Sequence, residues 1–160
     1  MDEFPRTRIT GAFERRVASA LDRLVPQPEC VIVACSGGPD STAALVAIAR
    51  SGQPLVVAHF DHRMRSDAES KADRAAVATL ATQFAVPLLA GRGSGHARSE
   101  DDARTERYRW LASAAVESGV TACVTGHTLD DQAETVLLRL TRGASLTGAA
   151  GMAESAPWPI

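Results

Sequence analysis

The chain has 160 residues and a formal net charge of −2. This length suffices for one α/β domain with a buried core. The nearly balanced charge excludes a surface dominated by basic residues, so any contact with RNA has to be local. The lack of an apolar run of about 18 residues excludes a membrane-spanning helix, and the N-terminus lacks the pattern of a signal peptide. Three cysteines without a Cys-x-x-Cys pair are typical of a cytoplasmic protein with buried thiols.

Helical and strand patterns alternate along the chain. The predicted helices cover residues 10–25, 42–50, 66–84, 99–118 and 128–142. The predicted strands cover residues 30–35, 55–60, 86–90 and 120–125. This alternation predicts a single α/β domain over residues 1–160, in which a parallel sheet carries helices on both faces as three layers.

The segment from Ser36 to Ser41 lies between the first predicted strand and the helix that follows it. Its glycines let the backbone approach a ligand closely, and a helix N-terminus offers free N–H groups at the positive end of the helix dipole. Pro39 suits the first helical position, where a missing N–H costs little. The segment is therefore a candidate phosphate-binding loop, although an ordinary strand-to-helix turn would share the same glycines.

Asp40 lies within this loop, whereas the single lysine of the chain, Lys71, lies in a later predicted helix. The loop therefore differs from a Walker A motif, which needs a lysine after its last glycine. A carboxylate 4 Å from a phosphate is repelled by about 4 kcal/mol at an effective dielectric of 20. A bridging Mg²⁺ reverses the sign of this interaction, so the pattern predicts a metal-bound nucleotide. The alternative is that Asp40 caps its own helix.

Two further segments follow predicted strands and are expected close to this loop. His62 follows the second strand, and Gly126 and His127 follow the fourth. Ligands of parallel α/β sheets bind beyond the carboxyl ends of the strands, so the three segments are expected at one crevice. From the sequence alone, His127 fits a structural hydrogen bond as well as it fits a catalytic contact.

Asp131 and Glu134 are three residues apart at the start of the last predicted helix and share one of its faces. Carboxylates in a first helical turn often do no more than complement the helix dipole. Beside His127, however, they are also candidate ligands for a second metal ion, or groups that orient a nucleophile.

Three arginines, Arg104, Arg107 and Arg109, lie on the preceding predicted helix, with acidic residues nearby. They fit a solvated charged face held by weak ion pairs. They also fit a clamp for phosphate groups or an RNA backbone.

Several motifs together resemble those of the tRNA(Ile)-lysidine synthetases, which belong to the N-type ATP pyrophosphatases of the PP-loop superfamily. Residues 36–41 match the loop S-G-G-x-D-S, which alone is shared by the whole superfamily. Residues 61–65 resemble D-H-G-L-R, and residues 100–108 match E-x-x-A-R-x-x-R-Y. Residues 125–135, TGHTLDDQAET, resemble the signature of the family, and the likeness continues to about Met152.

The resemblance implies an adenine nucleotide alpha hydrolase-like fold with strand order 3-2-1-4 and room for a fifth strand. It also implies a cytoplasmic ligase that uses ATP and Mg²⁺ and often forms a homodimer. In the family reaction, ATP adenylates O2 of the wobble cytidine in a minor tRNA(Ile) with a CAU anticodon, and pyrophosphate leaves. The amine of free L-lysine then displaces AMP, which gives lysidine.

The resemblance also assigns roles to individual residues. ATP binding is implied for Ser36, Gly37, Gly38, Pro39, Asp40, Ser41, His62 and Gly126. Catalytic roles are implied for Asp40, Arg104, Arg107, His127, Asp131 and Glu134. The implied Mg²⁺ ligands are Asp40, Asp131 and Glu134.

The chain departs from the family pattern at three points. Arg63 replaces the glycine of D-H-G-L-R, and Pro39 fills a position that usually holds a larger apolar residue. The C-terminal tRNA-binding domains of the family are expected to be absent from this chain. Two alternatives therefore stay open. The first is another PP-loop tRNA-modifying enzyme, such as a thiolase, and the second is a nucleotide-binding module without catalysis.

Overall fold

The computed structural model describes residues 5–25, 29–64, 66–141, 151 and 153–156. The helices are α1 (Arg8–Leu24), α2 (Pro39–Ser51), α3 (Asp67–Gln83), α4 (Glu100–Ser118) and α5 (Leu129–Thr141). The strands are β1 (Val31–Ala34), β2 (Leu55–Asp61), β3 (Leu88–Arg92) and β4 (Ala122–Thr125). All strand pairs are parallel and the order is β3-β2-β1-β4, which confirms the expected 3-2-1-4 arrangement.

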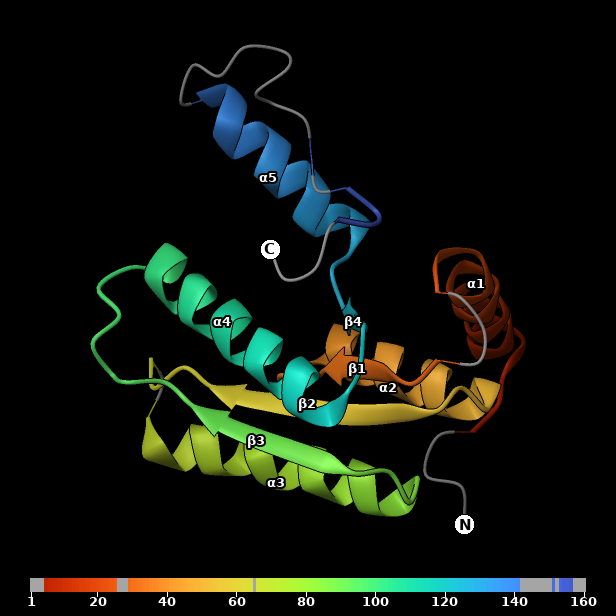
Figure 1. Cartoon of the computed structure of the whole chain (residues 1–160). Coiled ribbons are helices and arrows are strands. Elements are labelled where there is room, and N and C mark those ends of the chain that lie inside the picture. The colour runs from red at the N-terminus through yellow and green to blue at the C-terminus, as the bar shows by residue number, and fades with distance from the viewer. Residues whose placement is uncertain (1–4, 26–28, 65, 142–150, 152, 157–160) are drawn as a thin grey trace.

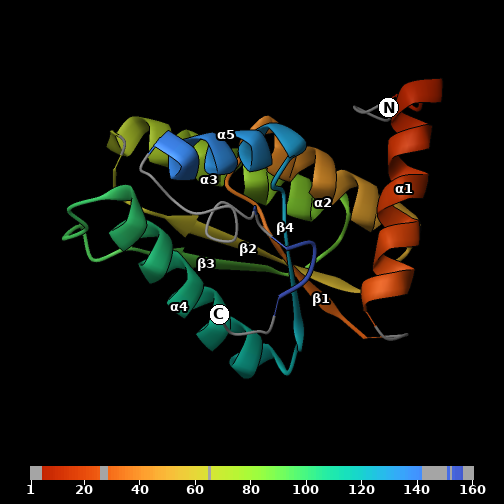
Figure 2. The ribbon, with the colours of Figure 1, turned by 90° about the horizontal axis from the view of Figure 1, so that it is seen from above.

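The sheet lies between two helical layers (Figures 1 and 2). Alternate residues of a strand point to opposite faces, so Val31 and Val33 of β1 pack in one core with α2 and α3. Ile32, between them, packs in a second core with Leu111 of α4. The three-layer prediction is therefore confirmed. α1 packs beside α2, where buried Glu14 accepts a hydrogen bond from Arg50 at 2.8 Å.

Two strands begin later than their sequences predict, because the preceding helices end in extra turns. Ala85 adopts a φ of 52°, and the N–H of Val86 bonds back to the carbonyl of Ala81. The chain therefore joins the sheet as β3 at Leu88, two residues after the predicted start. The N–H of Val120 likewise bonds back to α4, and β4 begins only at Ala122.

α2 begins at Pro39, three residues before its predicted start, with Gly38 as its N-cap. Pro39 thus occupies the first helical position, as expected from its missing N–H. At the other end, Gly52 has a φ of 81° and ends the helix in the left-handed conformation that glycine adopts easily.

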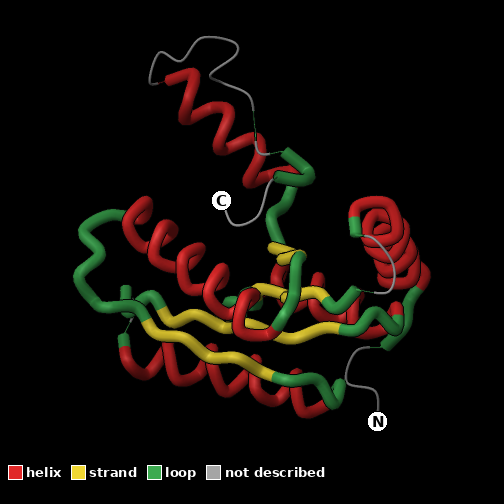
Figure 3. Tube along the Cα trace, viewed as in Figure 1, coloured by secondary structure: helices red, strands yellow, loops and turns green. Residues whose placement is uncertain are grey.

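α5 follows β4 after a three-residue turn and extends away from the sheet (Figures 1 and 3). Leu129 and Leu137 of this helix are exposed. Arg142, where the helix is predicted to end, lies outside the described residues. No helix in the described part of the chain is long and apolar enough to cross a membrane.

Candidate active site

The loop from Ser36 to Ser41 joins β1 to α2 and closes on the side chain of Ser41. The Oγ of Ser41 accepts a hydrogen bond from the N–H of Ser36 at 3.2 Å and donates one to the carbonyl of Gly38 at 3.1 Å. Gly37 has a φ of 93°, and a Cβ there would lie 3.1 Å from the Cβ of Asp73 on α3. The sharp turn and this close approach explain the need for glycine.

The N-terminus of α2 has no side-chain cap. In contrast, the N-termini of α1, α3 and α4 are capped by Thr7, Ser66 and Ser99. Asp40 is exposed in the first turn and makes no capping hydrogen bond, so the capping alternative for this residue does not hold. The first amides of α2 and the positive end of its dipole remain available to an anion.

A cavity of about 230 Å³ borders this helix N-terminus. From the loop and the segments that follow β2 and β4, its lining includes Ser36, Gly38, Pro39, Asp40, Ser41, His62, Thr125, Gly126 and His127. The helices α4 and α5 contribute Arg107, Leu111 and Asp131. All three segments expected at one crevice therefore line one cavity. Three of the expected site residues do not line it, namely Gly37, Arg104 and Glu134.

The apolar part of this cavity consists of residues that the sequence reasoning did not single out as site residues. Ala34 of β1, with Ala58 and Phe60 of β2, lies there opposite Leu111 of α4. These strand residues occupy the alternate positions that face α4, close to the carboxyl ends of their strands. This alternation is the signal that could have identified them. An apolar wall beside an anion site suits a nucleobase joined to phosphates.

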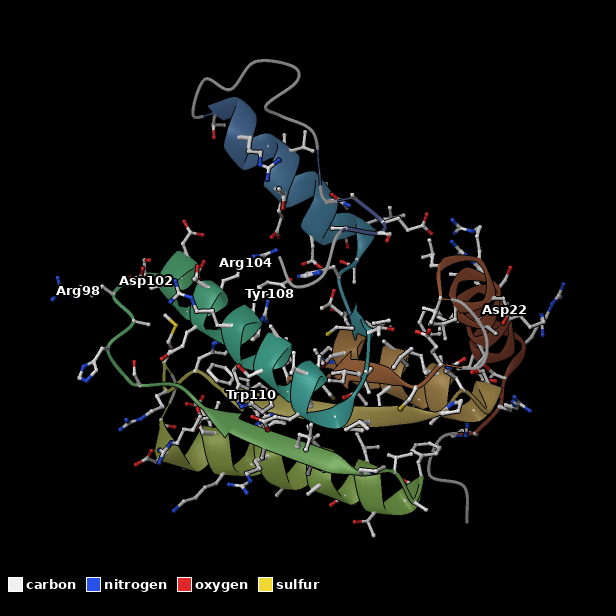
Figure 4. All side chains as sticks on the ribbon, in the orientation of Figure 1. Asp22, Arg98, Asp102, Arg104, Tyr108 and Trp110 are labelled. Carbon is white, nitrogen blue, oxygen red and sulfur yellow. The ribbon has the colours of Figure 1, made fainter. Side chains whose placement is uncertain are left out.

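The ring of Phe60 lies 5.4 Å from that of Trp110 on α4. The indole of Trp110 lies against the backbone of Gly91 on β3, so close that a Cβ on this glycine would collide with it. Figure 4 shows Trp110 between α4 and the sheet.

His62 and Arg107, which line the cavity, each have a polar atom without a hydrogen-bond partner among the described residues. In the described part of the chain, Nδ1 of His62 and Nε of Arg107 are buried without a hydrogen-bond partner. Burial, reinforced by the Arg107 guanidinium, lowers the pKa of His62. His62 is therefore neutral at neutral pH, and the permanent charge of Arg107 is the one suited to an anionic ligand.

His127 lies beside the loop, with its Nδ1 2.9 Å from the Oγ1 of Thr125. Burial first, and then the charges of Arg104 and Arg107, lower the pKa of His127. A neutral imidazole held by a threonine hydroxyl can accept or donate one hydrogen bond to a ligand.

The guanidinium carbons of Arg104 and Arg107 lie 5.2 and 5.1 Å from the ring centroid of Tyr108 on α4. Figure 4 shows Arg104 and Tyr108 on this helix. Arg104 lines a second cavity of about 280 Å³, which shares His62 and Arg107 with the first. Arg109 is exposed and lines neither cavity. The structure thus separates two arginines of the predicted clamp from the third.

Asp131 bonds back to Thr128, the residue that precedes α5, and also lines the cavity. Its Oδ2 accepts hydrogen bonds from the N–H of Thr128 at 2.6 Å and from the hydroxyl of Thr128 at 3.0 Å. The backbone N–H of Thr128 is the main reason that the pKa of Asp131 is lowered. Asp131 therefore stays ionised at neutral pH, whereas Glu134, one turn further along α5, is exposed.

The donor set fits a magnesium ion only together with a phosphate. Among the described residues, no three His, Cys, Asp or Glu side chains gather to hold a metal ion on their own. Asp40 and Asp131, however, line the same cavity. Two carboxylates with substrate phosphates and water are the ligands that Mg²⁺ ordinarily takes beside a nucleotide.

Comparison with known proteins identifies the family. The model of the PP-loop domain matches residues 9–159. The chain belongs to the PP-loop family. This family is one of ATP-binding domains. We use the name PP-loop below for the segment from Ser36 to Ser41, whose residues match S-G-G-x-D-S.

The PP-loop domain is similar to curated proteins named tRNA(Ile)-lysidine synthase. The protein from Methylobacterium nodulans is 45% identical over 127 residues, which cover 76% of this chain and 37% of that protein. The Synechococcus sp. protein is 40% identical over 88% of this chain and 44% of its own length. The Salinispora arenicola protein is 42% identical over 89% of this chain and 44% of its own length. The chain therefore spans about two fifths of these relatives.

A solved structure supports the fold. The U34-tRNA thiolase NcsA from Methanococcus maripaludis, with its [4Fe-4S] cluster, superposes with a TM-score of 0.67 at 14% identity. The match covers 86% of this chain and 52% of that one. At this identity the likeness concerns the PP-loop fold alone.

Proposed function

We propose that this PP-loop domain is the adenylating part of a cytoplasmic tRNA(Ile)-lysidine synthase. Relatives with that name are 40% or more identical over most of the chain. The domain would use ATP to adenylate O2 of the wobble cytidine in a tRNA(Ile) with a CAU anticodon. Free L-lysine would then displace AMP to form lysidine.

One observation carries the proposal. The uncapped N-terminus of α2 and Asp131 line the same cavity, although they lie far apart in the sequence. An anion at the helix N-terminus would therefore lie beside carboxylates, which requires a cation between them. This arrangement suits a metal-bound polyphosphate rather than a bare anion.

Each residue has a defined task in this proposal. The loop amides bind the leaving pyrophosphate, and no Walker lysine is needed because attack occurs at the α-phosphate. Arg107 stabilises the charge that develops on the phosphate oxygens. His127 and His62, both neutral, position the nucleotide or the cytidine by hydrogen bonds. Arg104, in the adjoining cavity, would contact the anticodon loop.

Mg²⁺ would neutralise the charge between carboxylates and phosphates. Asp40 and Asp131 would hold it directly. We place Glu134 as an outer ligand that acts through a water molecule, because Mg²⁺ keeps several waters and Glu134 does not line the cavity.

The test is pyrophosphate release from ATP with Mg²⁺, L-lysine and the CAU-anticodon tRNA(Ile). We expect release to depend on this tRNA and to fall about 100-fold or more in Asp131→Asn. Asparagine keeps an oxygen for the Thr128 amide but lacks the charge. Glu117→Gln, an exposed change at the far end of α4, is the control. ATP binding without tRNA-dependent release would instead indicate a nucleotide-binding module.

The thiolase alternative has less support. Cys30 precedes β1 and Cys35 follows it, whereas Cys123 lies within β4. Burial raises the pKa of Cys123 to about 12, so this thiol is a poor nucleophile. The described residues bring no three such ligands together for a cluster.

A further inference from the structure

The peptide group between Cys35 and Ser36 is held at both of its polar atoms. Its carbonyl oxygen, on Cys35, lies 3.0 Å from Nδ1 of His59, and its N–H, on Ser36, donates to the Oγ of Ser41 at 3.2 Å. A carbonyl only accepts hydrogen bonds, so Nδ1 of His59 carries the proton. This peptide group is the first of the PP-loop.

His59 is an unusual residue for its place in the sheet. It lies on β2 with 3% of its surface exposed, on the same face of the strand as Leu55 and Val57. That face packs in the apolar core with α2 and α3. The Nε2 atom of His59 is buried with no hydrogen-bond partner among the described residues. A buried polar atom without a partner is destabilising, so packing alone does not explain a histidine here.

We propose that His59 is a positioning residue of the PP-loop, which acts through the carbonyl of Cys35. The proposal rests on nucleotide binding at this loop, as set out under the proposed function. β1 fixes the chain only up to the N–H of Cys35, which donates to the carbonyl of Ala58 at 2.9 Å. Beyond that point the hydrogen bond from His59 fixes the orientation of the next peptide plane.

The orientation of this peptide plane determines the rest of the loop. Rotation of the plane would break the hydrogen bond from the Ser36 amide to Ser41. Ser41 is the residue that also binds the carbonyl of Gly38, the N-cap of α2. His59 therefore holds the loop in its binding shape before phosphate arrives, which lowers the cost of ordering the loop on binding.

Three substitutions at this position separate positioning from packing. In His59→Asn, the amide nitrogen is the same number of bonds from Cα as Nδ1. In His59→Gln it is one bond further away, and His59→Leu has no donor. We expect the dissociation constants of Mg·ATP and of inorganic pyrophosphate to rise about tenfold in the leucine and glutamine variants. In the asparagine variant they should stay within about threefold of the original protein.

Thermal unfolding of each variant shows whether the fold is retained. If His59 has a purely structural role, all three variants should have a lower melting temperature but the same affinity for Mg·ATP and pyrophosphate when folded. That result would overturn the proposal. Equal affinity in the asparagine and glutamine variants also overturns it. This pair decides the question even where the leucine variant does not fold.

Two readouts are independent of the proposed enzymatic activity. The ¹⁵N spectrum of labelled histidine should show His59 protonated at Nδ1, and the Nε2–H form would overturn the proposal. Amide hydrogen exchange at residues 36–38, 40 and 41 should be faster in the glutamine variant than in the asparagine variant, and equal rates would overturn it. Absence of tRNA-dependent pyrophosphate release would defeat the proposed function but leave both of these results standing.

Discussion

Gly126 lies directly against the backbone of Ser41. A Cβ added to Gly126 would lie 2.8 Å from the Cα and 2.9 Å from the amide nitrogen of Ser41. The turn after β4 therefore touches the last residue of the PP-loop with no side chain between them. This close approach brings His127 and Asp131 to the end of the cavity that borders the N-terminus of α2.

We expect Gly126→Ala to push the PP-loop and the β4–α5 turn apart. Overpacking of this kind destabilises a protein by about 1–3 kcal/mol, and Mg·ATP affinity should fall with it. Chemical unfolding and nucleotide titration measure the two effects. Gly11→Ala in α1 is the control, because the nearest atom to its new Cβ is 3.6 Å away. It should instead stabilise the helix by about 0.5–1 kcal/mol. An alanine at residue 126 that leaves both quantities unchanged would contradict the close approach.

Arg63 occupies a glycine-like conformation, with a φ of 59°. Its N–H donates to Oδ1 of Asp61 at 2.8 Å and its guanidinium donates to the carbonyl of Ser94 at 3.1 Å. We expect Arg63→Gly to change the free energy of unfolding by less than about 1 kcal/mol, because relief of strain offsets the lost contacts. Arg63→Val should be less stable than the glycine variant by about 1–3 kcal/mol. Urea unfolding tests the order, and equal stabilities would refute it.

Asp131 and Glu134 of α5 should differ in their effect on Mg²⁺ binding. Asp131→Asn removes a charge from the cavity lining, and the Mg²⁺ concentration needed for half-maximal ATP binding should rise about tenfold or more. Glu134→Gln should raise it by less than about threefold, because a ligand that acts through water contributes less. Calorimetric titration of Mg²⁺ at fixed ATP compares them. The reverse order would place Glu134 in direct contact with the ion.

Stability should fall in mildly acidic solution because of two histidines. The pKa values of His62 and His127 are lowered in the folded protein, chiefly by burial. Below about pH 6.5 the unfolded chain therefore binds more protons than the folded one, and the free energy of unfolding decreases as pH falls. The lowered carboxyl pKa of Asp131 acts only at lower pH, near the ordinary value of about 3.9 and below.

Urea unfolding between about pH 7 and pH 5 measures this dependence. The slope should flatten when His62 and His127 are both replaced by glutamine. His96→Gln, a change at an exposed residue of the loop after β3, is the control and should keep the slope. An unchanged slope in the double variant would assign the effect to other groups.

The parts of the fold that local signals determine could be predicted from the sequence. The PP-loop, the Ser66 cap of α3 and the left-handed glycine after α2 each follow from residues close together in the chain. β3 begins two residues later than predicted because Ala85 adopts a positive φ at the end of α3. Alanine is not a residue type that indicates a turn. A positive φ is uncommon for alanine, so the residue type gives no sign of this conformation.

The site was predictable where residues lie at strand ends, and less so on helices. Helical spacing grouped Arg104, Arg107 and Arg109, but the direction in which α4 crosses the sheet decides that Arg107 reaches the cavity. Asp131 and Glu134 share a helical face, yet only the first turn of α5 borders the cavity. Crossing angles depend on contacts between distant segments, which residue spacing does not encode.

The contact between Trp110 and Phe60 gives the protein an optical probe. Phe60 lines the cavity proposed to hold the nucleotide, and its ring lies 5.4 Å from the indole. The chain has two tryptophans, Trp110 and Trp158, so replacing Trp158 by phenylalanine leaves one tryptophan, next to the site. Filling of the cavity then becomes visible in the emission of an unlabelled protein.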